Sequence, residues 1–154
     1  METTAVEMMP LALELWSRNK AEYWLDRIQE VRDNPICAFF QPQPGSSTQG
    51  RCAIYPMRPL ICRLFGFFTV RNKYGKYVYG SCRVIKQSYP EVYEKALRMI
   101  GEWNHPSVGT DYSIRIIGTD AMLGSSMLPI NRAASVALEK IGYRLESIER
   151  SRSA

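Results

Sequence analysis

The sequence predicts a predominantly helical α+β fold, organised as a single domain over residues 1–154. Apolar residues recur at helical spacing near both ends of the chain, which is typical of amphipathic helices. Two short runs of strand-forming residues flank a turn sequence at residues 72–75, and proline-rich turns lie between the cysteines. A chain of 154 residues is long enough to bury a hydrophobic core without disulfide bonds.

The first helical region is expected to begin at Pro10 and to reach about Arg32. Proline is favoured at the first helical position, because its missing N–H would have no helical partner there. The sequence Asp33-Asn34-Pro35 then ends the region. One or two helices account for the spacing of the apolar residues, which are Leu11, Leu15, Trp24, Ile28 and Val31.

Turns and loops are predicted on both sides of Cys52. Residues 41–49 are rich in Pro, Gly, Ser and Gln, so they are expected to form an exposed loop. Pro56 and Pro59 favour turns, and one helical turn starting at Pro59 would carry Cys62. The thiols are therefore expected to lie on loops and short turns rather than in the helical core.

A β-hairpin is predicted in the middle of the chain. Residues 67–70 and 77–80 are rich in aromatic and β-branched side chains, and they flank Asn72-Lys73-Tyr74-Gly75. The second strand of this hairpin would end next to Cys82.

A capping box predicts the next helix. Ser88 and Glu91 have the required spacing, and Pro90 lies between them. Residues 112–117 are then expected to form a short strand. The apolar face of the helix is expected to hold Val92, Tyr93, Ala96, Leu97 and Ile100.

A long amphipathic helix is predicted at the C-terminal end. Gly142 would be its weak point, because glycine disfavours helix interiors. Residues 150–154 are expected to form a frayed tail. The apolar positions of this helix are Ala134, Ala137, Leu138, Ile141, Leu145 and Ile148.

Composition and charge favour a cytoplasmic protein without a membrane partner. No apolar run approaches the roughly 20 residues that a bilayer span needs. Residues 1–10 contain two glutamates and lack the basic and apolar regions of a secretory signal. The net charge of +5 is interpreted as a modest basic excess spread over the surface, so a nucleic-acid partner is not expected. In a reducing cytosol, thiols are available for metal binding.

The cysteines are the main candidates for a functional site. Four thiolates can close one tetrahedral metal site. Their separations are irregular and contain no Cys-x-x-Cys motif, so two other interpretations stay open: buried core thiols, and redox or disulfide use. The four residues are Cys37, Cys52, Cys62 and Cys82.

Arginines accompany these cysteines. A nearby cation favours thiolate, the form that binds metal, and arginine donors can offset the negative charge of a thiolate site. The alternative is that these arginines are solvated or paired with carboxylates such as Glu91 and Glu94. The arginines beside or between the cysteines are Arg51, Arg58, Arg63 and Arg83.

Three segments resemble a known family, the YkgJ-like cysteine-cluster proteins, described as a zinc- or iron-chelating CxxCxxCC domain. They are Cys37-Ala38-Phe39-Phe40, Gly50-Arg51-Cys52-Ala53-Ile54-Tyr55 and Arg58-Pro59-Leu60-Ile61-Cys62-Arg63. The resemblance covers residues 37–82. It implies an iron–sulfur cluster or zinc bound by Cys37, Cys52, Cys62 and Cys82. Arg58 and Arg63 match the family's arginines, and we infer that they support the sulfurs as hydrogen-bond donors.

The family's CxxCxxCC cluster normally precedes the segment that matches Cys37, but residues 1–36 contain no cysteine. Either the cluster lies upstream of this chain, or the chain is a four-thiol variant. In the first case the alternative function is a metal-free interaction or nucleic-acid-binding module. A related architecture in a flagellin lysine-methylating enzyme also makes an accessory domain of a protein-modifying enzyme an alternative.

Other functions have weaker support in the sequence. Residues 63–68 resemble the aromatic strand of an RNA-recognition motif, but Pro56 and Pro59 stand where its preceding elements would be. The preferred interpretation of the hairpin is therefore core aromatic residues with basic residues facing water. His105, the sole histidine, is expected on a surface loop, and no nucleophile motif or paired carboxylates indicate catalysis. Enzymatic activity stays open.

Overall fold

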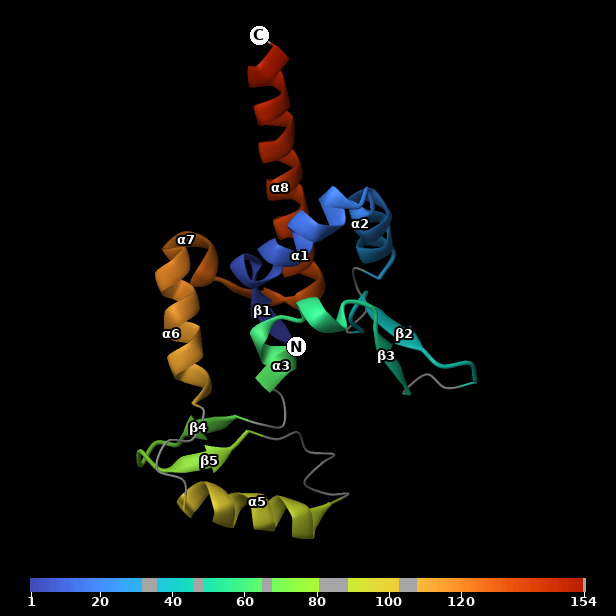
Figure 1. Ribbon diagram of the computed structural model, residues 1–154. Helices are drawn as coiled ribbons and strands as arrows, with labels where there is room; N and C mark the ends of the chain where they lie inside the picture. Colours follow the sequence, from blue (N-terminus) through green and yellow to red (C-terminus); the bar gives the residue numbers. More distant parts are fainter. Residues whose placement is uncertain (32–35, 46–48, 65–67, 81–88, 103–107, 154) are drawn as a thin grey trace. The chain divides into compact units, whose positions relative to one another are not determined.

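The computed structural model describes most of the chain, and Figure 1 labels its helices and strands. Within the described residues, helices predominate and are joined by three antiparallel strand pairs, which confirms the predicted helical α+β class. None of the helices described is long and apolar enough to cross a membrane. The described residues are 1–31, 36–45, 49–64, 68–80, 89–102 and 108–153.

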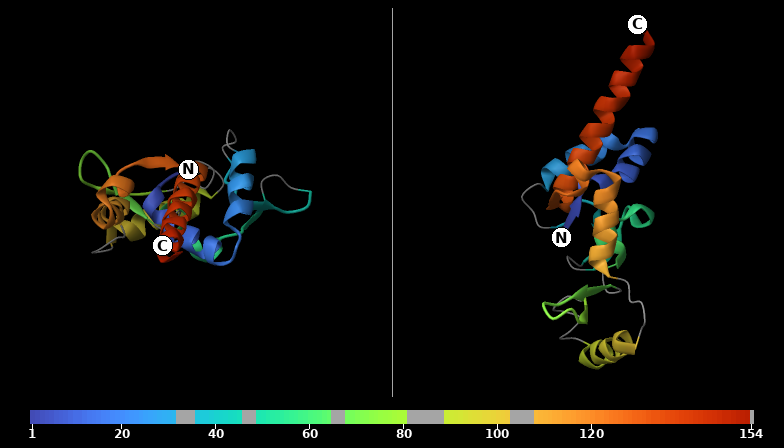
Figure 2. Two further views of the ribbon diagram at one scale, coloured as in Figure 1. Left: turned by 90° about the horizontal axis from the view of Figure 1, so that it is seen from above. Right: turned by 90° about the vertical axis from the view of Figure 1, so that its left-hand side faces the viewer.

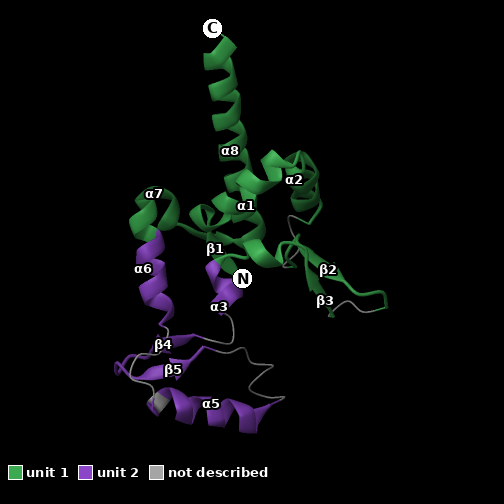
Figure 3. Ribbon diagram, in the orientation of Figure 1, with its two compact units in different colours: residues 1–59, 117–154 green, residues 60–116 purple. Residues whose placement is uncertain are grey.

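The chain forms two compact units, shown in Figure 3. We call residues 1–59 and 117–154 the helical unit, and residues 60–116 the hairpin unit. The helical unit contains β1 (Glu2–Thr4), α1 (Ala5–Ser17), α2 (Ala21–Glu30), β2 (Phe40–Pro42), β3 (Gly50–Cys52), the 3-10 turn η1 (Tyr55–Met57), α7 (Ala121–Gly124), β6 (Met127–Pro129) and α8 (Ile130–Ser153). The hairpin unit contains α3 (Leu60–Leu64), β4 (Thr69–Arg71), β5 (Tyr77–Tyr79) and α5 (Pro90–Glu102), and α6 (Gly109–Thr119) begins there.

Helix α1 begins earlier than the sequence predicted. The Thr4 hydroxyl accepts a hydrogen bond from the Glu7 amide (3.4 Å), and the Glu7 carboxylate accepts one from the Thr4 amide (3.0 Å). This capping box starts the helix at Ala5 and leaves Pro10 inside it, so the predicted start at Pro10 is wrong. The reciprocal bonds satisfy the first amides of the helix, whereas Pro10 costs it a single interior hydrogen bond.

The core of the helical unit lies where α1 packs along the first half of α8 (Figures 1 and 2). Its fully buried side chains include Met8 of α1, Leu138 of α8 and Phe39, just before β2. The Trp16 indole N–H donates to the Leu138 carbonyl (2.9 Å) and ties the end of α1 to α8. Strand β1 pairs with β6, so the starts of both helices are joined.

Gly142 is a packing position rather than the weak point that the sequence suggested. A Cβ atom there would lie 2.6 Å from Cζ2 of the Trp16 ring. The α8 backbone can approach Trp16 this closely because Gly142 has no side chain.

Gly142→Ala is therefore expected to lower the free energy of unfolding by about 2 kcal/mol, because the added methyl overpacks the Trp16 contact. Urea unfolding measures the change. The matched control is Gly118→Ala in α6, where a Cβ would meet nothing within 4 Å, and this variant should be neutral or slightly stabilising. Equal effects of the two substitutions would contradict the packing described here.

The predicted loop at residues 41–49 contributes to a second strand pair. Phe40 pairs with Cys52 and Pro42 with Gly50 in the antiparallel β2–β3 hairpin. The Ala53 amide donates to the Phe39 carbonyl (2.8 Å) and extends the pairing beyond the strands. The described residues 41–45 are exposed, as predicted, and residues 46–48 lie outside the described part.

In the hairpin unit, the predicted β-hairpin is present. Val70 pairs with Val78 in the antiparallel β4–β5 pair. The Asn72 carboxamide accepts from the amides of Tyr74 (2.9 Å) and Lys76 (3.1 Å), and Gly75 adopts a positive φ of 75° in the turn. These side-chain bonds, together with the glycine, explain why the turn sequence predicted the hairpin.

Helix α3 confirms the helical turn expected to carry Cys62, and α5 confirms the helix expected after Pro90. On α5, Ile100 is buried and Tyr93 is half-buried, but Val92 is 64% exposed, so the buried face is narrower than the sequence suggested. Ser88 lies outside the described residues.

The strand predicted at residues 112–117 is wrong, since this segment belongs to α6. A strand needs a neighbouring strand for its backbone hydrogen bonds, whereas a helix provides them internally. The short alternation in polarity is compatible with both structures. Tyr112 and Ile116 are both half-buried and are spaced one helical turn apart, as a helix requires.

The long C-terminal helix is confirmed by α8. Its backbone is helical as far as Ser153, although a frayed tail was expected from residue 150. The described residues from Tyr143 onward are exposed, and the right-hand view in Figure 2 shows this half extending beyond α1 and α2.

Candidate metal centre

The β2–β3 hairpin brings together two of the four predicted ligands. Cys37 lies just before β2, and Cys52 is the last residue of β3, paired with Phe40. The charge of a Cys52 thiolate raises the pKa of the Cys37 thiol. Both are half-buried free thiols that pack against the core of the helical unit. The β2–β3 pairing therefore places the two cysteines in one neighbourhood of this unit.

The backbone turns tightly just after Cys37. The Phe40 N–H donates to the Cys37 carbonyl (3.0 Å), and the amides of Phe39 and Phe40 act on the thiol by lowering its pKa. Amides near a sulfur favour the thiolate over the neutral thiol, and amides that donate to ligating sulfurs tune metal–sulfur centres.

Burial raises the pKa of the Cys37 thiol above its ordinary value, because the charged form is poorly solvated there. The neighbouring Cys52 thiolate also raises this pKa by repulsion, whereas the Phe39 and Phe40 amides lower it. In the metal-free protein, Cys37 therefore stays protonated at a pH where an exposed thiol would ionise.

In the metal-free protein, the rate of Cys37 alkylation by iodoacetamide should rise with pH. An ordinary thiol has its midpoint at about pH 8.5, and the midpoint for Cys37 should lie above that. The substitution Cys52→Ser removes the repelling charge, so the midpoint should move to lower pH. Mass spectrometry of peptides alkylated across a pH series measures both midpoints.

The same pKa shift has a consequence for folding. The raised folded-state pKa contributes stability at low pH, and this contribution is lost as the pH rises from the unfolded thiol's pKa through the folded one. In the alkylation series, a midpoint for Cys37 that is the same in Cys52→Ser and in the parent protein would show that the two sulfurs do not interact.

Asn131 holds the Cys37 segment against α8, and the sequence analysis missed this residue. The Ala38 N–H donates to Asn131 Oδ1 (2.9 Å), and Asn131 Nδ2 donates to the Ile36 carbonyl (2.9 Å). The two bonds clamp the backbone on either side of Cys37. Asn131 is buried at the start of α8, and a polar residue at a helix start is too common to have indicated this role.

The other two predicted ligands are placed differently. Cys62 lies on α3 in the hairpin unit and is half-buried. Cys82 lies outside the described residues, as do Arg83 and His105. Within the described ranges, no three His, Cys, Asp or Glu side chains gather as a metal-binding group. Cys37 and Cys52 are thus the pair that the structure brings together, and the four-cysteine ligand set stays a prediction.

The described arginines of the motif make local contacts. The Arg58 guanidinium lies 3.6 Å from the centroid of the Tyr55 ring, and its Nε donates to the Tyr55 carbonyl (3.1 Å). The Arg51 Nε donates to the Gln41 side chain across the β2–β3 hairpin (3.0 Å). Arg63 lies exposed on α3. The supporting role predicted for Arg58 and Arg63 stays a prediction.

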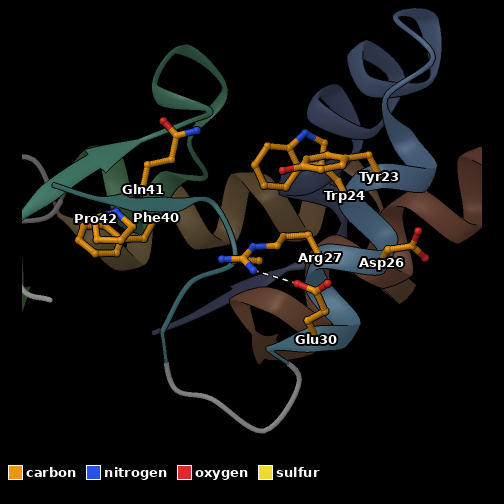
Figure 4. Close-up of a pocket in the computed structure, with 9 residues that line it drawn as sticks. Tyr23, Trp24, Asp26, Arg27, Glu30, Phe40, Gln41 and Pro42 are labelled. Atoms are coloured by element: carbon orange, nitrogen blue, oxygen red, sulfur yellow. Dashed lines mark hydrogen bonds and ion pairs between the residues drawn. The ribbon is translucent and has the colours of Figure 1, made fainter. Parts of the chain in front are cut away.

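A pocket of about 470 Å³ lies beside this hairpin, between α2 and β2 (Figure 4). Trp24 forms part of its wall and packs against Phe39 with ring centroids 4.8 Å apart. The Arg27 guanidinium points into the space between the two elements and pairs with Glu30 (2.8 Å). The ion pair fills part of this pocket with the protein's own charges.

The basic β4–β5 hairpin differs from the sequence interpretation. Tyr74 is 74% exposed and Tyr77 is also exposed, so these rings are not core residues as expected. The cations pack on the rings: Arg71 lies 5.0 Å from the Tyr77 centroid, and Lys73 lies 4.9 Å from that of Tyr74. The strands β4 and β5 are short and bury little apolar surface. The two rings therefore stay exposed and contact the cations.

Comparison with known proteins gives no relative: no family model, curated protein or solved structure matches this chain. The resemblance noted in the sequence therefore rests on the residues of the cysteine segments alone.

Proposed function

We propose that this protein binds a soft metal through cysteine thiolates, either as an iron–sulfur cluster or as zinc. The observation that carries the proposal is the β2–β3 pairing, which sets Cys52 opposite Phe40, close in the chain to Cys37. Cys62 and Cys82 complete the proposed ligand set, and the cytoplasm is the proposed compartment. The resemblance of residues 37–63 to the cysteine-cluster family supports the same assignment.

The donor set fits a soft metal. Cys37 and Cys52 supply sulfur ligands, which zinc and iron–sulfur clusters both accept. The amides of Phe39 and Phe40, which lower the pKa of Cys37, would be available to a metal-bound sulfur there. Such donors at ligating sulfurs orient the ligand and tune the centre.

The alternative of buried core thiols fits less well. A core thiol behaves as a small hydrophobic group and is usually fully enclosed. Cys37 and Cys52 are instead half-buried, and the amides of Phe39 and Phe40 lower the pKa of Cys37, although burial raises it by more. An amide near a sulfur favours the thiolate form. The purely apolar surroundings of a core thiol would have no such polar group.

Zinc and an iron–sulfur cluster would have different consequences. Zinc would act as a structural clamp, and its binding energy would add directly to the stability of the fold. An iron–sulfur cluster would supply electron transfer, with a potential set by the hydrogen bonds to its sulfurs. In either case the chain's own contribution is to hold Cys37 and Cys52 together at the hairpin.

Anaerobic purification followed by elemental analysis and a visible spectrum tests the proposal. Bound iron with acid-labile sulfide and visible absorption would identify a cluster, whereas one equivalent of zinc without colour would identify the clamp. Cys37→Ser and Cys52→Ser should each lose most of the metal, and the control His105→Ala should retain it. Metal-free protein in which all four thiols react readily with alkylating agent would overturn the ligand assignment.

A further inference from the structure

A second pocket, of about 660 Å³, opens beside Cys52 in the helical unit. Its wall is largely apolar and is formed by side chains of α1, α2 and η1. Leu15 and Ile54 are buried, while Trp24 and Met57 are half-buried beside the pocket. The half-buried Cys52 is part of the same wall. Such a surface suits the apolar body of a small organic molecule.

The polar residues of this pocket are mainly cationic. Arg18, Lys20 and Arg51 line it, and Glu14 is the one carboxylate among its lining residues. Glu14 is already paired with Arg18 of the same helix. Two positive charges, those of Lys20 and Arg51, are left without a carboxylate from the pocket lining.

Lys20 and Arg51 reach the pocket from different elements. Lys20 lies in the turn between α1 and α2, as the N-cap residue of α2. Arg51 lies on β3 beside Cys52, and its Nε donates to the neutral side-chain amide of Gln41. A neutral partner orients the guanidinium but does not offset its charge.

We propose that this pocket binds a small organic anion. The apolar body of the ligand would lie against Trp24, and its carboxylate, sulfonate or phosphate would face Lys20 and Arg51. Because Cys52 is part of the wall, the bound ligand would also cover this thiol. The pocket beside Arg27 is a poorer candidate for an anion, because its lining has two carboxylates, those of Asp26 and Glu30, and a single cation, Arg27.

Two fluorescent dyes of similar apolar shape test the proposal: anilinonaphthalene sulfonate, an anion, and phenylnaphthylamine, which is neutral. The sulfonate should bind at one site with salt-sensitive affinity. The double variant Lys20→Met/Arg51→Met should weaken its binding about tenfold, because two exposed charge contacts are lost. The neutral dye should bind this variant as it binds the parent protein.

The matched control is Arg132→Met/Lys140→Met, which makes the same charge change at exposed positions of α8. It should leave the binding of both dyes unchanged. Equal weakening of the sulfonate in the two double variants, or equal loss of both dyes in the pocket variant, would overturn the anion site. Absence of sulfonate binding to the parent protein would overturn it as well.

A chemical readout locates the site. The sulfonate dye should slow the alkylation of Cys52 by iodoacetamide and leave Cys62, in the hairpin unit, unaffected. Equal rates at Cys52 with and without dye would place the ligand elsewhere and refute the proposal. The measurement uses metal-free protein, so its outcome is independent of whether the thiols bind metal.

Discussion

Replacing Asn131 by alanine should lower the free energy of unfolding by about 3 kcal/mol and loosen the segment that carries Cys37. The side chain is 8% exposed and makes two backbone hydrogen bonds, both 2.9 Å long. Its removal leaves the buried Ala38 amide without this acceptor, and an unsatisfied buried donor costs about 1–3 kcal/mol. The cavity left by the missing carboxamide adds to the loss.

Two measurements check this expectation. Urea unfolding gives the loss of stability, and iodoacetamide labelling in native buffer should show faster modification of Cys37. The control Arg132→Ala changes the neighbouring exposed residue of α8 and should alter neither quantity appreciably. If Asn131→Ala lost stability but left Cys37 labelling unchanged, Asn131 would support the core without positioning the thiol.

Replacing Phe39 by alanine should destabilise the helical unit by about 4 kcal/mol, the typical cost of removing a buried aromatic side chain. Phe39 is fully buried and contacts Trp24, and its carbonyl accepts a hydrogen bond from Ala53. The side chain therefore anchors the backbone between Cys37 and β2 to the core.

The adjacent Phe40 provides a matched comparison for Phe39. It is half-buried and lies in β2, so Phe40→Ala should cost less than half as much. Thermal unfolding of both variants, followed by circular dichroism, measures the difference. Similar losses for the two substitutions would mean that Phe39 does not anchor this segment.

The sequence predicted correctly those elements that are stabilised by interactions between residues close together in the chain. The β4–β5 hairpin follows from Asn72 and Gly75, whose preferences determine the turn. Helix α8 follows from the spacing of its apolar residues. The same reasoning failed at α6, where a short alternation is compatible with both a strand and a helix. It also placed the start of α1 at Pro10, because the Thr4–Glu7 pattern was overlooked.

For the candidate site, the sequence could predict which residues are ligand candidates but not how they are placed in space. The sequence indicated that Cys37 and Cys52 are ligand candidates, but their meeting depends on the β2–β3 pairing across a polar loop. The role of Asn131 could not be predicted, because it binds backbone atoms of Ile36 and Ala38, and any residue type supplies those atoms. Contacts of this kind leave no pattern in the sequence.

The bond from the Trp16 indole to the Leu138 carbonyl gives the protein an intrinsic optical reporter. When α1 separates from α8, this fluorophore moves from a helix carbonyl into water, and its emission should shift to the red. Trp24, which packs on Phe39, reports on the neighbourhood of Cys37. In a Trp103→Phe background, which removes the third tryptophan, comparison of the protein with and without Trp16→Phe would therefore distinguish opening of the helix pair from opening of the thiol-bearing hairpin.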